Sequence, residues 1–432
     1  MTWVERFLKI STKHFRPLMK CEEHFLTFEG SFREEVGILF SEQGKTSNAC
    51  PVHIERNCVG VEHWCVKCLY LHAYYKFLNV TGQAGKFLHP EELNSSTRCV
   101  LLFCGDCSTA WNVRKKLFQQ TLSSEETNKD DLVLTELNLS KLVLRRHPKS
   151  SEAFSHRRWI LKQIVGRDFS EAKLWFRFTD FNGILCGTCR GIKSETPTQV
   201  SKVVDITDGI WLKVRSEMSM CIDAANRHAC NYNAWSHRIW TIHNLVLKPF
   251  LSNMAGRKSS ESLYWSKVFE FFENELDKVR HWIERHISDH SPMAYIQEIA
   301  FILSVLIKIK HQDICQCHQG VCDGSRDTRQ MQNDIVQIWV KLMDQSEELL
   351  TLYEGCHEAL WNYRRGIIAT FQKLVHKDLD VGIDSHNSYK PFNTFKVEEE
   401  FCNKFIPHKV AGKFSERYLA FIRRHVFVKK SL

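Results

Sequence analysis

Apolar residues recur along this chain at the spacing of an amphipathic helix, and one template returns five times. Each copy has an aromatic residue at its first position and an apolar residue seven positions later. The aromatic residues are Trp111, Phe154, Trp235, Tyr295 and Trp361. The apolar residues are Phe118, Leu161, Ile242, Ile302 and Ile368. Because two helical turns take about 7 residues, both positions lie on one face, which would pack against a neighbouring helix.

Four of the five copies carry arginine three positions after the aromatic residue. These arginines are Arg114, Arg157, Arg238 and Arg364. The position lies close to the apolar face, where a planar guanidinium can bridge to a neighbouring helix or to the preceding turn. We interpret the arginines as contacts between helices or across an interface rather than as catalytic groups. In the fourth copy, aligned on its tyrosine, the position holds Glu298.

A second helix-like stretch precedes most copies, and Pro148 and Pro292 stand where one helix must end and the next begins. Each unit is therefore predicted to be a helix, a short turn and a helix. The copies are unevenly spaced, which indicates inserts. The predicted organisation is a helical N-terminal extension (1–98), first repeats (99–165), a loop-like insert (166–212), middle repeats (213–310), a Cys-containing loop-like insert (311–333), a last repeat (334–380) and a loop-like tail (381–432) with a short amphipathic segment at 416–430.

Composition narrows the class of protein. The chain of 432 residues is 43% hydrophobic, which suffices for a sizeable core, and no apolar run reaches the roughly 18 residues of a membrane helix. The charged N-terminus lacks the apolar segment of a signal peptide, and the 17 scattered Cys favour free thiols in a reducing, cytoplasmic compartment. The net charge of +9 is spread along the chain, so we expect no nucleic-acid partner; an anionic substrate such as a diphosphate explains the charge equally well.

Pairs of Cys separated by two residues raise the question of a zinc site. They occur at 65–68, 104–107 and 186–189, and further Cys with a His lie at 315–322. The pairs CGDC and CGTC resemble zinc-knuckle turns. However, 104–107 falls in the turn between two predicted helices, 65–68 reads as helix, and the pairs are too far apart for a zinc ribbon. We expect no metal ligands in this chain, and a zinc-stabilised scaffold stays as an alternative that metal analysis would test.

Four copies share a more specific pattern. They read WNVRK at 111–115, PKSSEAFSHRRW at 148–159, NYNAWSHRIW at 231–240 and WNYRR at 361–365. This pattern resembles the protein prenyltransferase α-subunit repeat, and the resemblance covers about 100–375. It implies an all-α fold, a right-handed crescent or superhelix of stacked helical hairpins.

The resemblance also implies a partner. Subunits of this family wrap a separate β subunit, which carries a zinc ion, the isoprenoid pocket and most of the catalytic groups. The sequence lacks a Walker loop, a GxSxG elbow and an HExxH motif, which suits a subunit whose partner holds the metal. The implied reaction transfers a geranylgeranyl group from geranylgeranyl diphosphate to a C-terminal Cys of a target protein. The implied partner is a β subunit of the Rab geranylgeranyltransferase type, with no cofactor in this chain.

Three residues are implied to face the diphosphate. By position, Lys149 matches the family's Pro-Lys turn, whose flexible ammonium can follow the charge that develops on the leaving group. Asn231 and Tyr232 match an Asn-Tyr pair that lines the same region. Taken without the resemblance, most turn lysines are simply solvated, and Asn231 is a good helix N-cap. Both interpretations stay open at this point.

The chain departs from the family pattern at several positions. Ser150 and Ser151 stand where relatives often have Asn-Tyr. Phe154 replaces the usual Trp, and Glu298 replaces the usual Arg. These departures favour an alternative of another class, a non-catalytic helical-repeat adaptor that binds a prenyltransferase β subunit or another protein. Assays of isoprenoid transfer by the purified complex would separate the two.

Overall fold

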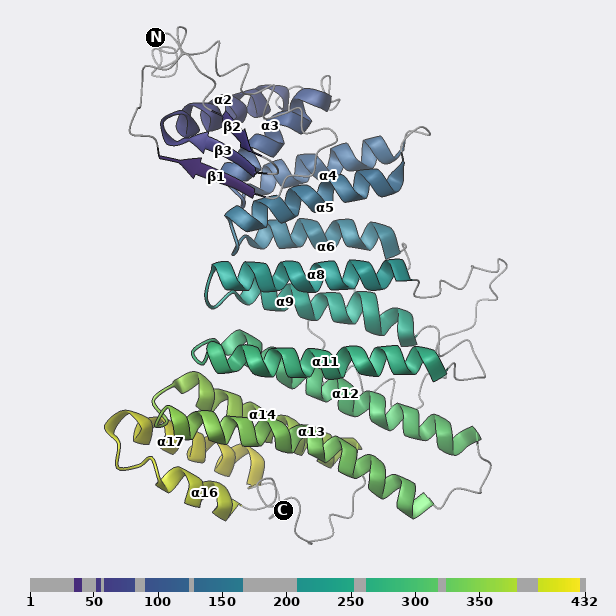
Figure 1. Cartoon of the computed structure of the whole chain (residues 1–432), viewed down its shortest axis with the longest axis vertical. Coiled ribbons are helices and arrows are strands. Elements are labelled where there is room, and N and C mark those ends of the chain that lie inside the picture. The colour runs from purple at the N-terminus through teal and green to yellow at the C-terminus, as the bar shows by residue number, and fades with distance from the viewer. Residues whose placement is uncertain are drawn as a thin grey trace. The chain divides into compact units, whose positions relative to one another are not determined.

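The chain folds into two compact units, each built from helical hairpins, so the predicted all-α class is confirmed (Figure 1). The first unit comprises 1–174 with 209–241, and the second comprises 175–208 with 242–432. The structure, a computed structural model, describes residues 35–40, 52–55, 58–81, 90–123, 128–165, 208–251, 262–317, 324–378 and 395–427.

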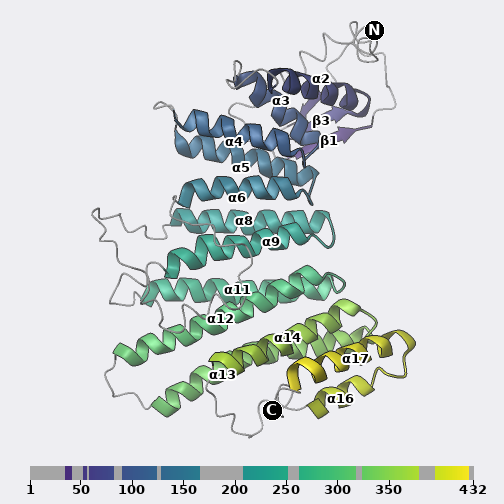
Figure 2. The same ribbon diagram turned by 180° about the vertical axis from the view of Figure 1, so that it is seen from behind.

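Within the first unit the helices stack in chain order, as both views in Figures 1 and 2 show. They are α2 (His63–Thr81), α3 (Pro90–Phe103), α4 (Ser108–Leu122), α5 (Lys129–Arg146), α6 (Ser151–Val165), α8 (Asp208–Arg227) and α9 (Tyr232–Thr241). Short turns at 104–107, 147–150 and 228–231 join them into three hairpins, α3–α4, α5–α6 and α8–α9. The predicted loop-like insert at 166–212 lies outside the described residues, apart from the start of α8.

A small sheet occupies part of the N-terminal region. Its strands are β1 (Glu35–Leu39), β2 (Val52–Glu55) and β3 (Cys58–Glu62), in the order β1-β3-β2, with β1 parallel and β2 antiparallel to β3. Val36, Val59 and Val61 are buried. Along β3 the two buried valines alternate with more exposed neighbours, a period of two that is typical of strands. The prediction that 1–98 is helical is correct for α2 and α3 but wrong for these strands.

The second unit contains three more hairpins. After η2 (Ile242–Leu247), its helices are α11 (Ser262–Arg285), α12 (His290–Cys317), α13 (Gly324–Leu352), α14 (Glu358–Asp378), α16 (Phe395–Asn403) and α17 (Lys409–Ile422), followed by η3 (Arg423–Phe427). The predicted loop at 311–333 is wrong, because α12 and α13 extend into it and only 318–323 lies outside the described residues. Its polar residues include good helix formers such as Gln and Arg, so the helices continue past the apolar stripe. The predicted tail likewise holds a hairpin, α16–α17.

The five predicted aromatic residues lie on the second helices of successive hairpins. Trp111, Phe154, Trp235, Tyr295 and Trp361 belong to α4, α6, α9, α12 and α14, and none of them is more than 3% exposed. The predicted helix–turn–helix repeat is therefore confirmed. The two copies with Trp and a preceding Gly also share a contact. The indole N–H of Trp111 and that of Trp361 each donate to a Gly carbonyl six residues earlier, at 2.8 Å.

One described stretch, His290–His311 of α12, is long and apolar enough to cross a membrane. However, 67% of its apolar window of 18 residues is buried inside the fold. It packs against α11, α13 and α14, which is what a core helix of a helical repeat does. We therefore interpret it as a core helix.

Candidate functional site

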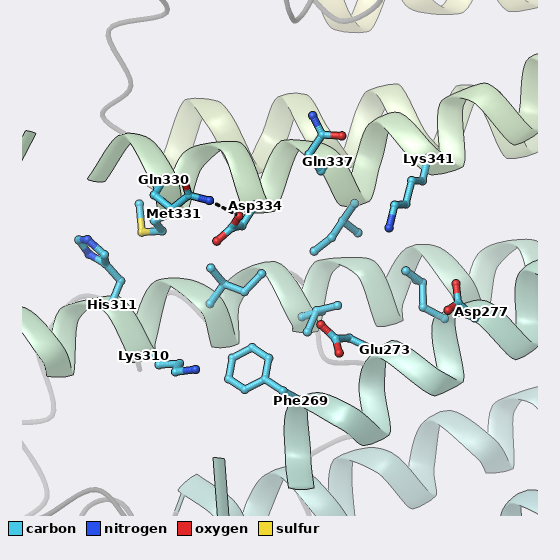
Figure 3. A pocket seen from close by; sticks show the side chains of 14 residues that line it. Phe269, Glu273, Asp277, Lys310, His311, Gln330, Met331, Asp334, Gln337 and Lys341 are labelled. Atoms are coloured by element: carbon cyan, nitrogen blue, oxygen red, sulfur yellow. Dashed lines mark hydrogen bonds between the residues drawn. The ribbon is translucent and has the colours of Figure 1, made fainter. Parts of the chain in front are cut away.

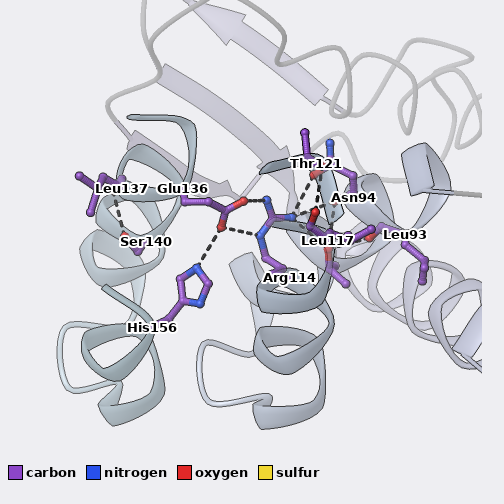
Figure 4. A network of polar contacts seen from close by, with 10 residues as sticks. Leu93, Asn94, Arg114, Leu117, Thr121, Glu136, Leu137, Ser140 and His156 are labelled. Carbon is purple, nitrogen blue, oxygen red and sulfur yellow. Dashed lines mark hydrogen bonds and ion pairs between the residues drawn. The ribbon is translucent and has the colours of Figure 1, made fainter. Parts of the chain in front are cut away.

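Among the described residues, three pairs of successive hairpins, each within one unit, are joined by buried ion pairs that we call the polar seam: an Arg of one hairpin, a Glu of the next, and a His or Tyr that also bonds the Glu. In the first example, Arg114 of α4 donates through Nε to Glu136 of α5 at 3.0 Å (Figure 4). The same guanidinium donates to Thr97 of α3 at 3.1 Å, and Nε2 of His156 in α6 lies 2.9 Å from the same carboxylate oxygen that accepts from Arg114 Nε. Arg114, Glu136 and His156 are each at most 4% exposed. The seam therefore ties four helices together.

The second example repeats the first one hairpin later. Arg157 of α6 forms two bonds with Glu217 of α8, at 2.6 and 2.7 Å, and His237 of α9 bonds the same carboxylate at 2.9 Å. All three side chains are at most 3% exposed. In both examples the Glu precedes its His by 20 residues, so the geometry belongs to the repeat.

A third example lies at the end of the second unit, where the sequence predicted mostly loop. Arg364 of α14 pairs with Glu398 of α16 at 2.8 and 2.7 Å, and Tyr418 of α17 donates to Glu398 at 2.5 Å. The guanidinium also lies 4.1 Å from the ring centroid of Phe401. The α16–α17 hairpin is therefore a sixth repeat. The sequence analysis missed it because this hairpin lacks the pattern of an aromatic residue followed three positions later by arginine.

Burial and the neighbouring charges determine the protonation states of Glu136 and His156 in the polar seam. Burial alone would raise the pKa of Glu136, but the charge of Arg114 and the bonds from His156 and Arg114 hold it at about 2. Burial lowers the pKa of His156, more than the bond to Glu136 raises it. The buried Nδ1 of His156 has no hydrogen-bond partner. A neutral ring that donates from Nε2 to an ionised Glu136 satisfies all of these observations.

The remaining predicted arginine, Arg238, repeats a contact that Arg157 makes with the carbonyl oxygen of Leu137, 20 residues earlier, at 2.6 Å. Arg238 is 3% exposed and donates to the carbonyl oxygen of Met218 in α8 at 2.7 Å. Its guanidinium lies 5.8 Å from the ring centroid of Trp235. The four predicted arginines are thus all buried against neighbouring helices, as the interpretation of contacts between helices requires.

The fourth copy has to be realigned by two residues. The hydroxyl of Tyr295 donates to Glu275, 20 residues earlier, at 2.5 Å, so Tyr295 is the counterpart of the seam histidines. The buried Met293 then takes the aromatic position. It stands four residues after Asp289, which caps the start of α12 by accepting from the Ser291 N–H at 2.9 Å.

This realignment corrects the prediction that a glutamate replaces the fourth arginine. Ile296, fully buried, takes the arginine position, whereas Glu298 lies two residues beyond it. In the following hairpin the seam carboxylate is replaced by Gln345, which accepts from the Tyr363 hydroxyl at 3.3 Å and donates to the Arg280 carbonyl at 2.9 Å. Both members of the ion pair are thus replaced together by uncharged residues, which avoids an unpaired buried charge at this position.

Lys149 lies in the turn between α5 and α6, and its side chain is exposed. The next residue, Ser150, is 2% exposed and caps α6 by accepting from the Ala153 N–H at 3.1 Å. The Ser150 hydroxyl also donates to the Gly105 carbonyl at 2.9 Å and to Asp106 at 2.8 Å. The turn that carries Lys149 is therefore fixed to the preceding hairpin.

The turn is fixed to the following hairpin as well. Asn231, fully buried, donates to the Pro148 carbonyl at 2.7 Å and caps α9 by accepting from the Ala234 N–H at 3.1 Å. Asn233, which the sequence analysis missed, donates to the Lys149 carbonyl at 2.8 Å. Of the predicted set, Asn231 is thus brought to the lysine turn, where it holds the backbone at Pro148.

The structure places Tyr232 on the surface, 61% exposed, beside a second cation that the sequence analysis also missed. Burial lowers the pKa of the Arg158 guanidinium, while the nearby Cys221 and Tyr232 side chains raise it. Arg158 donates to the Ser155 hydroxyl at 3.3 Å. In the sequence, Arg158 could have been recognised as the second arginine of HRRW at 156–159. Arg158 lies within α6 and Tyr232 is the first residue of α9, so these two side chains belong to the helices that follow the turns at 147–150 and 228–231.

Two of the three predicted Cys pairs lie among the described residues. The pair at 65–68 lies in α2, and the pair at 104–107 forms the turn between α3 and α4, as predicted. The pair at 186–189 lies outside the described residues. Among the described residues, no group of three or more His, Cys, Asp or Glu side chains is arranged to hold a metal ion.

A cavity of about 840 Å³ lies among α11, α12 and α13 (Figure 3). Leu303 and Ile307 of α12 are among its apolar lining residues, and Glu273 contributes a carboxylate. Lys310 stands at one end with its Nζ 4.9 Å from the ring centroid of Phe269. Charges of both signs surround apolar residues, so the cavity favours no single ligand class.

The chain is similar to known proteins, both in two of its hairpins and over most of its length. The family model described as Protein prenyltransferase alpha subunit repeat matches 133–164 and 214–245, which coincide with the α5–α6 and α8–α9 hairpins. Protein prenyltransferase alpha subunit repeat-containing protein 1-B of Xenopus laevis is 30% identical over 366 residues, covering 81% of this chain and 71% of that protein. The repeat-containing proteins 1 of Danio rerio and Homo sapiens are each 28% identical, covering 86% and 77% of this chain and 75% and 72% of their own.

Proposed function

The chain belongs to the protein prenyltransferase α-subunit repeat family, and on this premise we propose that it is the α subunit of a heterodimeric protein prenyltransferase. The observation that carries the proposal is the lysine turn. Lys149 is exposed, and amide side chains from the next hairpin hold both Pro148 and Lys149 by their carbonyl oxygens. A side chain that is free at its tip and fixed at its backbone suits contact with a ligand outside the chain.

The chemical role of Lys149 is to stabilise the leaving diphosphate. As the bond from carbon to oxygen breaks, negative charge grows on the diphosphate, and an ammonium on a flexible stem can follow it. Arg158, on the helix that follows the lysine turn, adds a second positive charge, and Tyr232, exposed at the start of α9, offers a hydroxyl that can donate a hydrogen bond. Asn231 and Asn233 act indirectly, by positioning the turn.

The proposed partner is a β subunit of the Rab geranylgeranyltransferase type, which supplies the zinc ion and the isoprenoid pocket. The proposed reaction transfers geranylgeranyl from its diphosphate to a C-terminal Cys of a target protein, in the cytoplasm. The family supports the heterodimer, whereas the isoprenoid, the β subunit and the target rest on the resemblance of the repeats alone.

Co-expression with candidate β subunits tests the proposal. We expect a stoichiometric complex with transferase activity, and a loss of about 10- to 100-fold in kcat for Lys149→Ala with the complex intact. Lys129→Ala, an exposed lysine at the opposite end of α5, is the matched control and should keep full activity. Failure to bind any prenyltransferase β subunit would remove the proposal.

One observation favours a second candidate function, an adaptor that binds a β subunit or another protein without turnover. Ser150 stands where relatives often have Asn, and its buried hydroxyl is engaged by Gly105 and Asp106. It therefore offers nothing to a substrate. A complex that forms stoichiometrically and transfers no isoprenoid at saturating diphosphate would establish the adaptor.

A further inference from the structure

The CGDC turn brings two thiols within reach of each other. The Cys107 N–H donates to the Cys104 carbonyl at 3.2 Å, which closes a four-residue turn. Such turns hold their end Cα atoms within about 7 Å, and disulfides span roughly 4.4–6.8 Å between Cα atoms. We infer that Cys104 and Cys107 form a dithiol modification site that is reversibly oxidised to an intramolecular disulfide.

Both sulfur atoms are placed to react. Each Cys is half-buried, so a small oxidant has access. Cys107 is the N-cap residue of α4, yet its side chain makes no capping hydrogen bond, which leaves the sulfur available. The pair at 65–68 has the same spacing, but Cys65 is fully buried and its thiol donates to the Glu62 carbonyl at 3.2 Å. The turn, and not the spacing alone, distinguishes the reactive pair.

Electrostatics set the conditions of the reaction. Burial raises the pKa of Cys104, the charge of Cys107 raises it further, and the Asp106 backbone N–H lowers it. Tyr70 lies beside the pair, since burial and then the two thiols raise the pKa of its phenol. Thiolate is the nucleophile and is a minor species at neutral pH. The oxidation should therefore speed up by about tenfold per pH unit until the thiol ionises.

The oxidant that we name is hydrogen peroxide. One thiolate attacks a peroxide oxygen, the O–O bond breaks, and a sulfenic acid and water form once the departing hydroxide is protonated. The second thiol then attacks the sulfenic sulfur, the S–O bond breaks, and a second water leaves. In sum, two thiols and one peroxide give one disulfide and two waters, and a dithiol reductant restores the thiols.

The residues between the two thiols hold the lysine turn. The Gly105 carbonyl accepts from the Trp111 indole and from the Ser150 hydroxyl, and Asp106 accepts from Ser150 as well. A Cβ at Gly105 would lie 3.0 Å from the His147 ring, so this turn and the next are in close contact. Closing a disulfide across 104–107 should shift these contacts and, through Ser150, Lys149. This last link rests on the proposed function.

Peptide mapping after peroxide treatment of the full chain tests the site. After brief oxidation and alkylation with N-ethylmaleimide, we expect the 104–107 peptide to lose two hydrogens and to escape alkylation, with reversal by dithiothreitol. Cys107→Ser should give a sulfenic acid that dimedone traps, and no disulfide. Cys104→Ser provides the same test if the first variant fails to fold, and Cys356→Ser, an exposed thiol elsewhere, should behave like the wild type.

Two outcomes would overturn the site: equal alkylation of both thiols before and after oxidation, or a disulfide from either thiol to another Cys. The chemical readout does not depend on transferase activity. If the complex is active, oxidation should lower its activity in the wild type but not in Cys107→Ser. A disulfide without transferase activity would refute the proposed function and keep the site, whereas activity without a disulfide would do the reverse.

Discussion

The seam arginines show how one buried side chain fixes the packing of several helices. Arg157 is 2% exposed and forms paired bonds with Glu217, a residue 60 positions away. A guanidinium suits this position because its fork matches a carboxylate and it stays charged at every accessible pH. Removing one partner leaves the other charge buried and unpaired, which costs more than removing both.

Glu217→Gln should therefore destabilise the chain by about 3–5 kcal/mol in urea unfolding followed by circular dichroism. The double variant Arg157→Ile with Glu217→Gln copies the natural pair Ile296 and Gln345 and should be clearly more stable than Glu217→Gln alone. If the two substitutions prove additive, the ion pair does not explain the arrangement.

At the scale of the element, each hairpin turn is fixed by side chains of its neighbours. Asn231 uses its amide twice as a donor and once as an acceptor, and it joins α8, α9 and the turn before α6. Its replacement loses a helix cap and leaves the Pro148 carbonyl without this donor. The expected loss of folding stability is the sum of these two contributions.

We expect Asn231→Ala to lower the free energy of unfolding by about 2–3 kcal/mol. Asn233→Ala removes only the exposed bond to Lys149 and should stay within about 0.5 kcal/mol of the wild type. If Lys149 contacts diphosphate, Asn233→Ala should nevertheless lower isoprenoid transfer, while the exposed Asn112→Ala should not. Equal stability of the two variants Asn231→Ala and Asn233→Ala would contradict the positioning argument.

At the scale of the whole molecule, the seam makes stability depend on pH. Glu136 and Glu217 keep a pKa of about 2 in the folded chain, against 4.5 for an unperturbed carboxyl. His156 and His237 are also lowered, from 6.5. In each case the unfolded chain binds protons that the folded chain does not, so stability is full above the unfolded pKa and falls as the pH drops.

We therefore expect the free energy of unfolding to decline below about pH 6.5, as the unfolded histidines take up protons, and more steeply between about 4.5 and 2, where the glutamates do so. Urea titrations at pH 7, 5.5 and 4 would measure the slope. The double variant of Arg157 and Glu217 should show a shallower decline. A flat profile down to pH 4 would mean that the histidines are not buried in the neutral form.

The sequence by itself determined what depends on local periodicity. The aromatic and apolar positions seven residues apart predicted the second helices, because the apolar face of a helix depends only on residues close together in the sequence. Pro148 likewise marked a turn. Lys149 came only from the resemblance of the repeats to the family, whereas the same local reasoning placed the arginines against neighbouring helices. It failed where the stripe was continuously apolar, around Tyr295, because nothing there marks the register.

Only the tertiary structure decided which residues meet. Glu217 and Glu398 lie in the sequence among other polar residues, and nothing local marks them as partners of Arg157 and Arg364. The contacts that select them join residues 60 and 34 positions apart, which no period of 3.6 can report. For the same reason the bond from Asn233 to the Lys149 carbonyl, 84 positions earlier, became visible only once the hairpins were stacked.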